Sequence, residues 1–159
     1  MILACTTGIG FLVSQKYTKR ESELKDFKSA FNLIKTKIRY TYEPLQEIFD
    51  DIAKNYNSSI AYVFKQASNN MQTQNATDGW NKAVNEAVIS ITKEDKRVVC
   101  SFGKLLGQTD SQGQINEIDL SLSLLDEQIE KAKIDKQKNV KLYKSLGVIT
   151  GIAIVIVLF

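Results

Sequence analysis

The feature that most constrains the fold is a helical pattern that runs from near Thr109 to the end of the chain. From Ile115 to Ala132 apolar side chains recur at the spacing of one helix face, and no Gly or Pro interrupts before Gly147. Lysines follow, and residues 145–159 are all uncharged and nearly all apolar. The pattern predicts one long helix that leaves water for lipid. Its apolar positions before the lysines are Ile115, Ile118, Leu122, Leu125, Ile129 and Ala132.

The length of the terminal apolar stretch decides whether it can cross a bilayer. Fifteen helical residues at about 1.5 Å each reach about 22 Å, short of a hydrocarbon core of about 30 Å. Counted from Leu142, with Lys144 snorkelling, the stretch is about 27 Å long and spans a slightly thinned bilayer. A buried core helix is the alternative, but the stretch has no polar face. We therefore expect residues 142–159 to form a C-terminal membrane helix.

A second uncharged stretch, residues 1–15, begins the chain, and basic residues follow it from Lys16 to Arg20. A signal peptide would place its bases before its apolar run, which this stretch does not. A lipoprotein site at Cys5 would need a basic and apolar leader, and that alternative requires a start upstream of Met1. We interpret residues 1–15 as an uncleaved N-terminal membrane anchor.

Positive charge is concentrated beside the two apolar ends, although the net charge is only +3. Residues 16–39 carry eight bases against three acids, and residues 131–144 carry six against one. Residues 110–130, by contrast, carry six acids and no base. By the positive-inside rule, the middle of the chain, residues 16–141, is predicted to be cytoplasmic, with both termini pointing away. The two cysteines fall in the anchor and in a predicted helix, so no disulfide is implied.

The first half of this middle part predicts three helices. One continues from the anchor to about Tyr40, and Pro44 suits the first position of a second that ends near Asn55. A third ends near Met71, and the polar residues 72–75 predict a loop. The expected core positions are Leu24, Phe27, Phe31, Ile34, Ile38, Leu45, Ile48, Phe49, Ile52, Ile60, Val63, Phe64, Ala67 and Met71.

The second half predicts a fourth and a fifth helix before the long one. Thr77 or Asp78 is the expected cap of the fourth, and Thr92 with Asp95 is typical of the start of the fifth, which Gly107 ends in the left-handed conformation. A β-branched run, 88–92, is too isolated to build a sheet. We predict an all-α, six-helix bundle flanked by an N-terminal and a C-terminal transmembrane helix. The expected inward positions of the fourth and fifth helices are Trp80, Ala83, Val84, Ala87, Val88, Val98, Val99, Phe102, Leu105 and Leu106.

The residues that catalysis commonly uses are missing. The chain has no histidine, its two cysteines are far apart, and it has no phosphate loop. Adjacent carboxylates such as Asp50 and Asp51 point in different directions on a helix, so they form no acid/base pair. We therefore expect no enzymatic activity, no metal and no cofactor.

Two short patterns are candidate interaction sites. Gly147 and Gly151 form a G-x-x-x-G pair, which lets membrane helices pack closely, although glycine is common in such helices. The turn 107–114 opens the long helix, where Thr109 with Gln112, or Ser111 with Gln114, fits a capping box.

Within that turn Asp110 lies near a helix N-terminus in either register, and it opens the acidic stretch. Capping is its structural role. The functional hypothesis is that Asp110, together with Gly107, Thr109 and Gln114, meets a basic surface on a partner protein.

Short groups of residues along nearly the whole chain resemble one family, and their order between two anchors is more specific than any single group. They are Gly10, Tyr17-Thr18-Lys19-Arg20, Ser29-Ala30-Phe31, Ile38-Arg39-Tyr40, Pro44-Leu45, Ile48, Trp80, Ala83, Leu105-Leu106-Gly107, Thr109-Asp110, Gln114, Leu120, Leu125, Leu142-Tyr143-Lys144 and Leu146-Gly147. With this pattern the sequence resembles the stage III sporulation protein AB family. The departures are small: threonine precedes Asp110 where we would expect serine, and little precedes the first anchor.

This resemblance implies a function. The family looks like the cytoplasmic domain of type II secretion platform proteins, which are six-helix bundles without enzymatic activity. It implies a scaffold in the mother-cell membrane around the forespore, within a machine that builds a channel across the double membrane. The implied partners are an ATPase, stage III sporulation protein AA, and other membrane subunits of the complex, with no nucleic acid and no small-molecule substrate.

Without the resemblance, a cytoplasmic bundle held to a membrane at both ends also suits a platform that receives another protein. The alternative is a peripheral tether whose basic faces bind anionic lipid, since each lysine near the surface adds about 1 kcal/mol. Salt distinguishes the two, because lipid attraction fades above about 0.15 M whereas a packed protein interface survives. An outward-facing protein with two anchors is a third alternative, which topology decides.

Overall fold

The computed structural model describes the backbone of residues 2–41, 43–56, 59–104 and 106–158. Side-chain surroundings are described for these residues from Gln15 to Leu142 and for Ser145. The described residues form six helices and no strand, which confirms the predicted all-α class and the number of helices. The helices are α1 (Ile2–Tyr40), α2 (Leu45–Asn55), α3 (Ser59–Asn70), α4 (Ala76–Glu86), α5 (Lys93–Ser101) and α6 (Ser111–Leu158).

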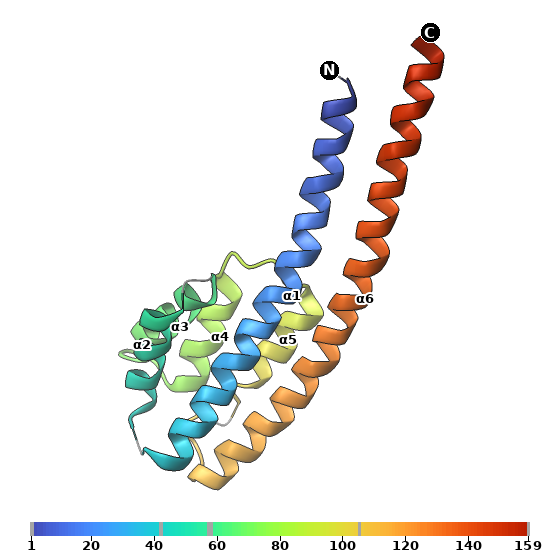
Figure 1. Cartoon of the computed structure of the whole chain (residues 1–159). Helices are drawn as coiled ribbons and strands as arrows, with labels where there is room; N and C mark the ends of the chain where they lie inside the picture. Colours follow the sequence, from blue (N-terminus) through green and yellow to red (C-terminus); the bar gives the residue numbers. More distant parts are fainter. Residues whose placement is uncertain (1, 42, 57–58, 105, 159) are drawn as a thin grey trace.

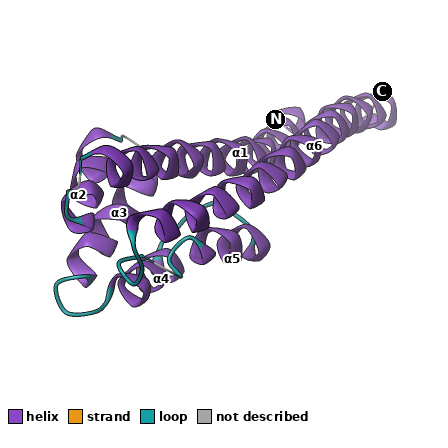
Figure 2. Ribbon diagram, turned by 90° about the horizontal axis from the view of Figure 1, so that it is seen from below, coloured by secondary structure: helices purple, strands orange, loops and turns teal. Residues whose placement is uncertain are grey.

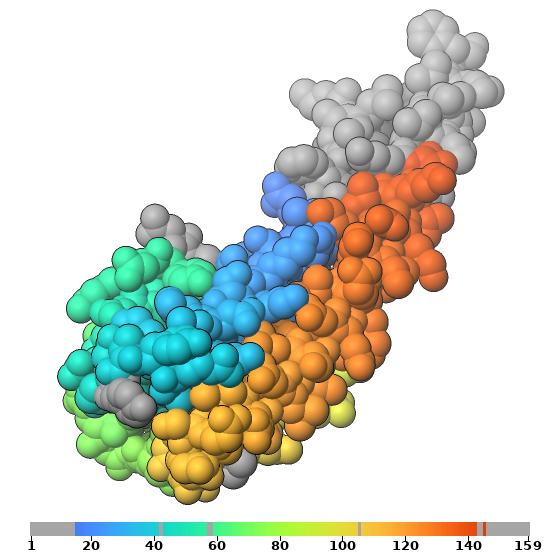
Figure 3. Space-filling view, turned by 60° about the horizontal axis from the view of Figure 1, so that its bottom comes forward, coloured from blue at the N-terminus to red at the C-terminus, as the bar shows by residue number. Residues whose placement is uncertain are grey.

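Two long helices form the frame of the molecule. α1 and α6 pack against each other more extensively than any other pair, and both project from the same end of the bundle, where the two termini lie (Figure 1). Seen from below, α2 to α5 lie beside the part of α1 and α6 that is away from the two chain ends (Figure 2). The space-filling view shows α1 and α6 in contact along one face (Figure 3).

Ion pairs add to the contact between α1 and α6. Lys28 Nζ lies 2.5 Å from Asp126 Oδ1, and Lys35 pairs with Asp119. Two lysines of α1 and two aspartates of α6 are therefore paired across the contact between these helices.

The two predicted membrane segments are only partly open to test. Both continue α1 and α6 as helical backbone, but most side chains of residues 1–15 and 142–159 lie outside the description. Within the part of the chain that is described, no helix has the length and hydropathy that a membrane span requires.

An aromatic cluster forms the centre of the core. Phe31 stacks on Phe102 with ring centroids 3.8 Å apart and an interplanar angle of 10°. Trp80 meets both rings edge-on, and its Nε1–H donates to the Val99 carbonyl at 2.9 Å. Most predicted core positions are confirmed as buried, whereas Leu45, Met71 and Val98 are half-buried and Leu105 lies outside the described residues. The largest fully buried side chains are Trp80, Phe27, Phe31, Phe49, Phe64, Phe102, Leu24, Ile34, Ile48, Ile52, Ile60 and Leu106.

The fifth helix is shorter than predicted. It ends at Ser101, and tight turns follow, with the Gly103 N–H donating to Cys100 O at 3.0 Å. Gly103 in these turns packs closely on the core, since a Cβ there would lie only 2.5 Å from Trp80 Cδ1. Gly107 does have the predicted left-handed conformation, with φ +69°, but it lies in the connection to α6 and not at the end of α5.

The fourth helix also differs from the prediction at both ends. Its cap is Asn75, whose side chain accepts from the Asp78 N–H at 2.8 Å, and the Thr77 hydroxyl donates to Gly103 O. At the other end Ala87 is extended, so Val88 leaves the helix and is 94% exposed, not inward.

Two other helix starts lie close to their predicted positions. The capping box of Thr92 and Asp95 is confirmed. Pro44 is the N-cap of α2, whereas the sequence predicted it at the first position inside that helix.

Candidate functional site

The turn between α5 and α6 brings the four predicted site residues together. The Gly107 N–H donates to Gln114 Oε1 at 3.2 Å, and Gln114 Nε2 donates to the Thr109 carbonyl at 3.1 Å. Asp110 Oδ1 accepts from the Gly113 N–H at 2.9 Å and from the Thr109 hydroxyl at 3.3 Å. The turn is a compact unit at the end of the bundle opposite the chain termini (Figure 1).

The cap of α6 is Asp110, and the two predicted capping boxes, Thr109 with Gln112 and Ser111 with Gln114, are wrong. The helix begins at Ser111, so Asp110 occupies the N-cap position and its carboxylate bonds to the third residue, Gly113. Glycine fits there because a Cβ would lie 2.9 Å from Asp110 Oδ1.

Asp110 is an exposed residue. Among the described residues it belongs to no ion pair, unlike Asp119 and Asp126 further along α6. The predicted proximity to a helix N-terminus is confirmed. The Asp110 carboxylate therefore caps α6 and also carries a negative charge that forms no ion pair within the described residues.

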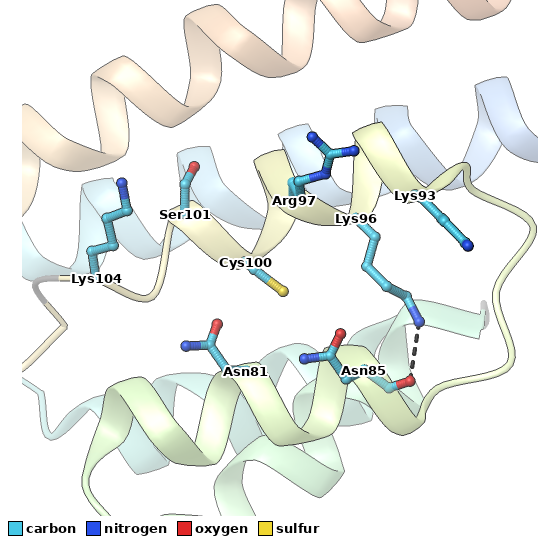
Figure 4. A pocket seen from close by; sticks show the side chains of 8 residues that line it. All are labelled: Asn81, Asn85, Lys93, Lys96, Arg97, Cys100, Ser101 and Lys104. Carbon is cyan, nitrogen blue, oxygen red and sulfur yellow. Dashed lines mark hydrogen bonds between the residues drawn. The ribbon is translucent and has the colours of Figure 1, made fainter.

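A second candidate surface, which the sequence did not reveal, is an open groove of about 630 Å³ between α4 and α5. Figure 4 shows Lys96 and Cys100 pointing toward Asn81 and Asn85 of α4, whereas Arg97 and Lys104 point away from that helix. Burial raises the pKa of the Cys100 thiol in this groove, so the cysteine is not activated as a nucleophile. The lining residues are Asn81, Asn85, Lys93, Lys96, Arg97, Cys100, Ser101 and Lys104.

A buried ion-pair cluster joins three helices on the side of the bundle from which α1 and α6 project. Arg20 Nε and Nη2 lie 2.7 and 3.0 Å from the two carboxylate oxygens of Asp95, and Nη1 lies 2.7 Å from Asp135 Oδ2. Burial raises the pKa of the Asp95 carboxyl, but hydrogen bonds from Arg20 and Thr92 outweigh that effect and hold its pKa below the usual value. The sequence treated Arg20 only as a base flanking the anchor, whereas its side chain is 9% exposed and fully engaged.

The remaining predicted site, Gly147 and Gly151, lies on α6 beyond the described side chains. No group of His, Cys, Asp or Glu among the described residues is arranged to hold a metal ion.

Comparisons with known proteins agree on one family. Residues 1–159 match the family described as Stage III sporulation protein AB. A relative of that name from Bacillus subtilis (strain 168) is 27% identical over 161 residues, which cover 99% of this chain and 94% of the relative. A solved structure of a stage III sporulation protein AB is similar with a TM-score of 0.71 at 22% identity, covering 76% of this chain and 98% of its own. At that identity the solved structure shows the shared fold alone.

Proposed function

The chain belongs to the stage III sporulation protein AB family, and we propose that within sporulation it is a non-enzymatic platform subunit of a membrane channel complex. In this proposal the bundle of residues 16–141 is held at the mother-cell membrane around the forespore by residues 1–15 and 142–159. The bundle then presents its far tip to a cytoplasmic ATPase, stage III sporulation protein AA, and to other membrane subunits.

One observation carries the proposal: α1 and α6 leave the same end of the bundle side by side, while the turn 107–114 lies at the opposite end (Figure 1). Two apolar segments at one end suit attachment to one membrane. The tip then lies about as far from that membrane as the bundle allows. This is the geometry of a scaffold that receives a soluble partner.

The charges of α6 favour this platform over a lipid tether. Lys131 Nζ pairs with Glu94 at 2.8 Å, and Lys136 Nζ pairs with Glu21 at 3.0 Å. A lysine that already has a carboxylate partner attracts anionic lipid less than a free one, because the pair carries no net charge. Two of the six lysines of residues 131–144 are therefore paired with carboxylates of α5 and α1.

The orientation is testable with a cysteine at the exposed Thr73. With both natural cysteines replaced (Cys5→Ser and Cys100→Ser), Thr73→Cys should be shielded from a membrane-impermeant thiol reagent in intact cells, because a cytoplasmic bundle lies behind the membrane. The same cells should label after lysis. Labelling before lysis would show that the bundle faces outward.

Asp110→Asn tests the proposed contact at the tip. Asparagine keeps the cap but removes the charge, so the free energy of unfolding should fall by no more than about 1 kcal/mol. We nevertheless expect the variant to fail to co-purify with the other membrane subunits and the ATPase from sporulating cells, and spore counts to fall. Normal assembly and sporulation would leave Asp110 as a cap and nothing more.

The matched control is Glu127→Gln, which removes one negative charge from an exposed position on the same helix. It lies away from the tip and, among the described residues, takes part in no ion pair. Assembly should be unaffected. If both variants fail alike, net charge and not the tip contact would explain the loss.

A further inference from the structure

The connection between α4 and α5 carries apolar side chains where a loop usually carries polar ones. Residues 87–91 are Ala, Val, Ile, Ser and Ile, whereas Gly, Pro, Asn, Asp and Ser dominate turns. Val88 is 94% exposed, more than any other large apolar side chain that is exposed in the described part of the chain. Ile89 and Ile91 are half-buried and pack against the core. Packing of the bundle therefore accounts for the two isoleucines and not for Val88.

Polar contacts hold this connection at the end of the bundle from which α1 and α6 project. The Ser90 N–H donates to Glu23 Oε2 at 2.5 Å, and Asp95, in the first turn of α5, pairs with Arg20 of α1. Figure 1 shows the connection rising from the end of α4 toward the side of the chain termini before it reaches α5. The exposed valine is thus placed on the side of the bundle that the two apolar segments share.

The level of the connection along α1 brings Val88 close to the end of the first apolar stretch. Glu23 follows Gln15 by eight residues, which is a rise of about 12 Å along a helix. Two extended residues cover about 7 Å, so from Ser90 the chain reaches up to about 5 Å below the level of Gln15. The headgroup layer on each side of a bilayer is about 5 to 7 Å thick. With residues 1–15 in the apolar layer, Val88 is therefore within reach of the headgroups.

The unpaired charge at this end of the bundle is mainly positive. Lys16, Lys93, Lys138 and Lys141 are exposed and belong to no ion pair among the described residues. Against them stands Glu86, an exposed carboxylate at the end of α4 that is also outside these ion pairs. Lysines near an anionic bilayer surface are attracted to it. An apolar side chain among such lysines suits the surface of a negatively charged membrane.

We propose that Val88 is a third membrane contact, which enters the headgroup layer of the same anionic bilayer that holds residues 1–15 and 142–159. The inference rests on the proposed attachment of both chain ends. Because α1 and α6 leave the bundle side by side, the bundle is free to tilt about the line that joins them. α4 packs mainly on α3 and α5, so its end lies beside that line. A contact there fixes the tilt, and with it the direction in which the turn 107–114 points.

The test compares labels at the two ends of the bundle, in the full chain reconstituted into phosphatidylglycerol vesicles. In the background without natural cysteines, Val88→Cys or Thr73→Cys carries a nitrobenzoxadiazole fluorophore. Thr73 is the matched control, because it is exposed in the connection before α4, on the side of the tip, where Gln108 Nε2 donates to Thr77 Oγ1 at 2.9 Å. Lipid with a spin-labelled headgroup should quench the Val88 label at least about twofold more than the Thr73 label.

A label beside Val88 tests the natural valine itself. With the fluorophore on Glu86→Cys, we expect Val88→Asp to remove most of the quenching, because an anionic surface repels the new carboxylate. Val88→Leu, which keeps an apolar side chain, should retain the quenching. Since the position is exposed, neither variant should alter unfolding of the chain.

The outcomes separate this contact from the attachment on which it rests. If the chain does not float with the vesicles, the attachment of both ends is wrong and the third contact is lost with it. A chain that floats while the Val88 and Thr73 labels are quenched equally overturns the third contact alone. Shielding of the Val88 label from iodide only at high protein density, without quenching by lipid, would assign Val88 to a contact between copies of the chain and also overturn the proposal.

Discussion

Asp95→Ala is expected to lower the free energy of unfolding by about 3 to 5 kcal/mol, because it leaves a buried guanidinium without its main partner. Asp95 is fully buried, and Arg20 is bound to it through two nitrogens. The same carboxylate accepts the Thr92 N–H at 2.8 Å, so its loss also removes half of the capping box of α5. Urea unfolding of the full chain in detergent, followed by the fluorescence of the only tryptophan, Trp80, measures the effect.

Two variants control for this prediction. Asp135→Ala removes the other partner of Arg20, but its side chain is 47% exposed, so the loss should stay below about 1 kcal/mol. Arg20→Met with Asp95→Leu removes both charges and should be less destabilising than Asp95→Ala alone, since no buried charge is left unpaired. If Asp95→Ala costs no more than Asp135→Ala, the cluster does not hold the three helices together.

The pH dependence follows from the sign of the shift. The pKa of Asp95 in the folded state lies below its usual value of 3.8, so its ionised form stabilises the fold. That contribution is complete above the unfolded value and is lost as the pH falls through the folded one. The difference in stability between the natural chain and Asp95→Ala should therefore be constant near neutral pH and shrink below about pH 4.

Phe31→Ala should lower the free energy of unfolding by about 3 to 5 kcal/mol as well, through loss of buried apolar area and the cavity that remains. The ring is 0% exposed, stacks on Phe102 and lies 5.9 Å from Trp80 between centroids. It therefore joins α1 to the segment after α5. The same urea titration measures the change. A red shift of the Trp80 emission maximum in the folded variant, relative to the folded natural chain, would indicate water entering the cavity.

Tyr40→Ala is the matched control, because this aromatic residue also lies on α1 but is 70% exposed. Its cost should stay within about 0.5 kcal/mol. A loss below about 1 kcal/mol for Phe31→Ala would mean that the core collapses around the vacancy or that the aromatic cluster contributes little.

Short-range patterns determined the fold class and most of the core. The three-and-four spacing of Leu24, Phe27, Phe31 and Ile34 predicted a buried seam on one long helix, and all four are fully buried. The pairing of Thr92 with Asp95 predicted the start of α5 from two residues that lie three apart. These features depend on the helix repeat and on bonds within one turn, so the local sequence is sufficient for them.

Only the tertiary structure decided where two helices end and which charges remain free. Near the start of α4 the Thr77 hydroxyl donates to Gly103 O, and Gly103, in the turns after α5, lies so close to Trp80 that a Cβ has no room. The role of Arg20 depends on Asp95, 75 positions away, which the charge pattern around the anchor did not indicate.

The ion pairs of α5 have the same origin, because packing brings the adjacent Glu94 and Asp95 to different partners, Lys131 of α6 and Arg20 of α1. The sequence by itself determined the helices, their apolar faces and the family resemblance. The rotation of each helix against its neighbours decided which polar side chains meet. That rotation is set by the packing of the whole core, and no window of the sequence contains it.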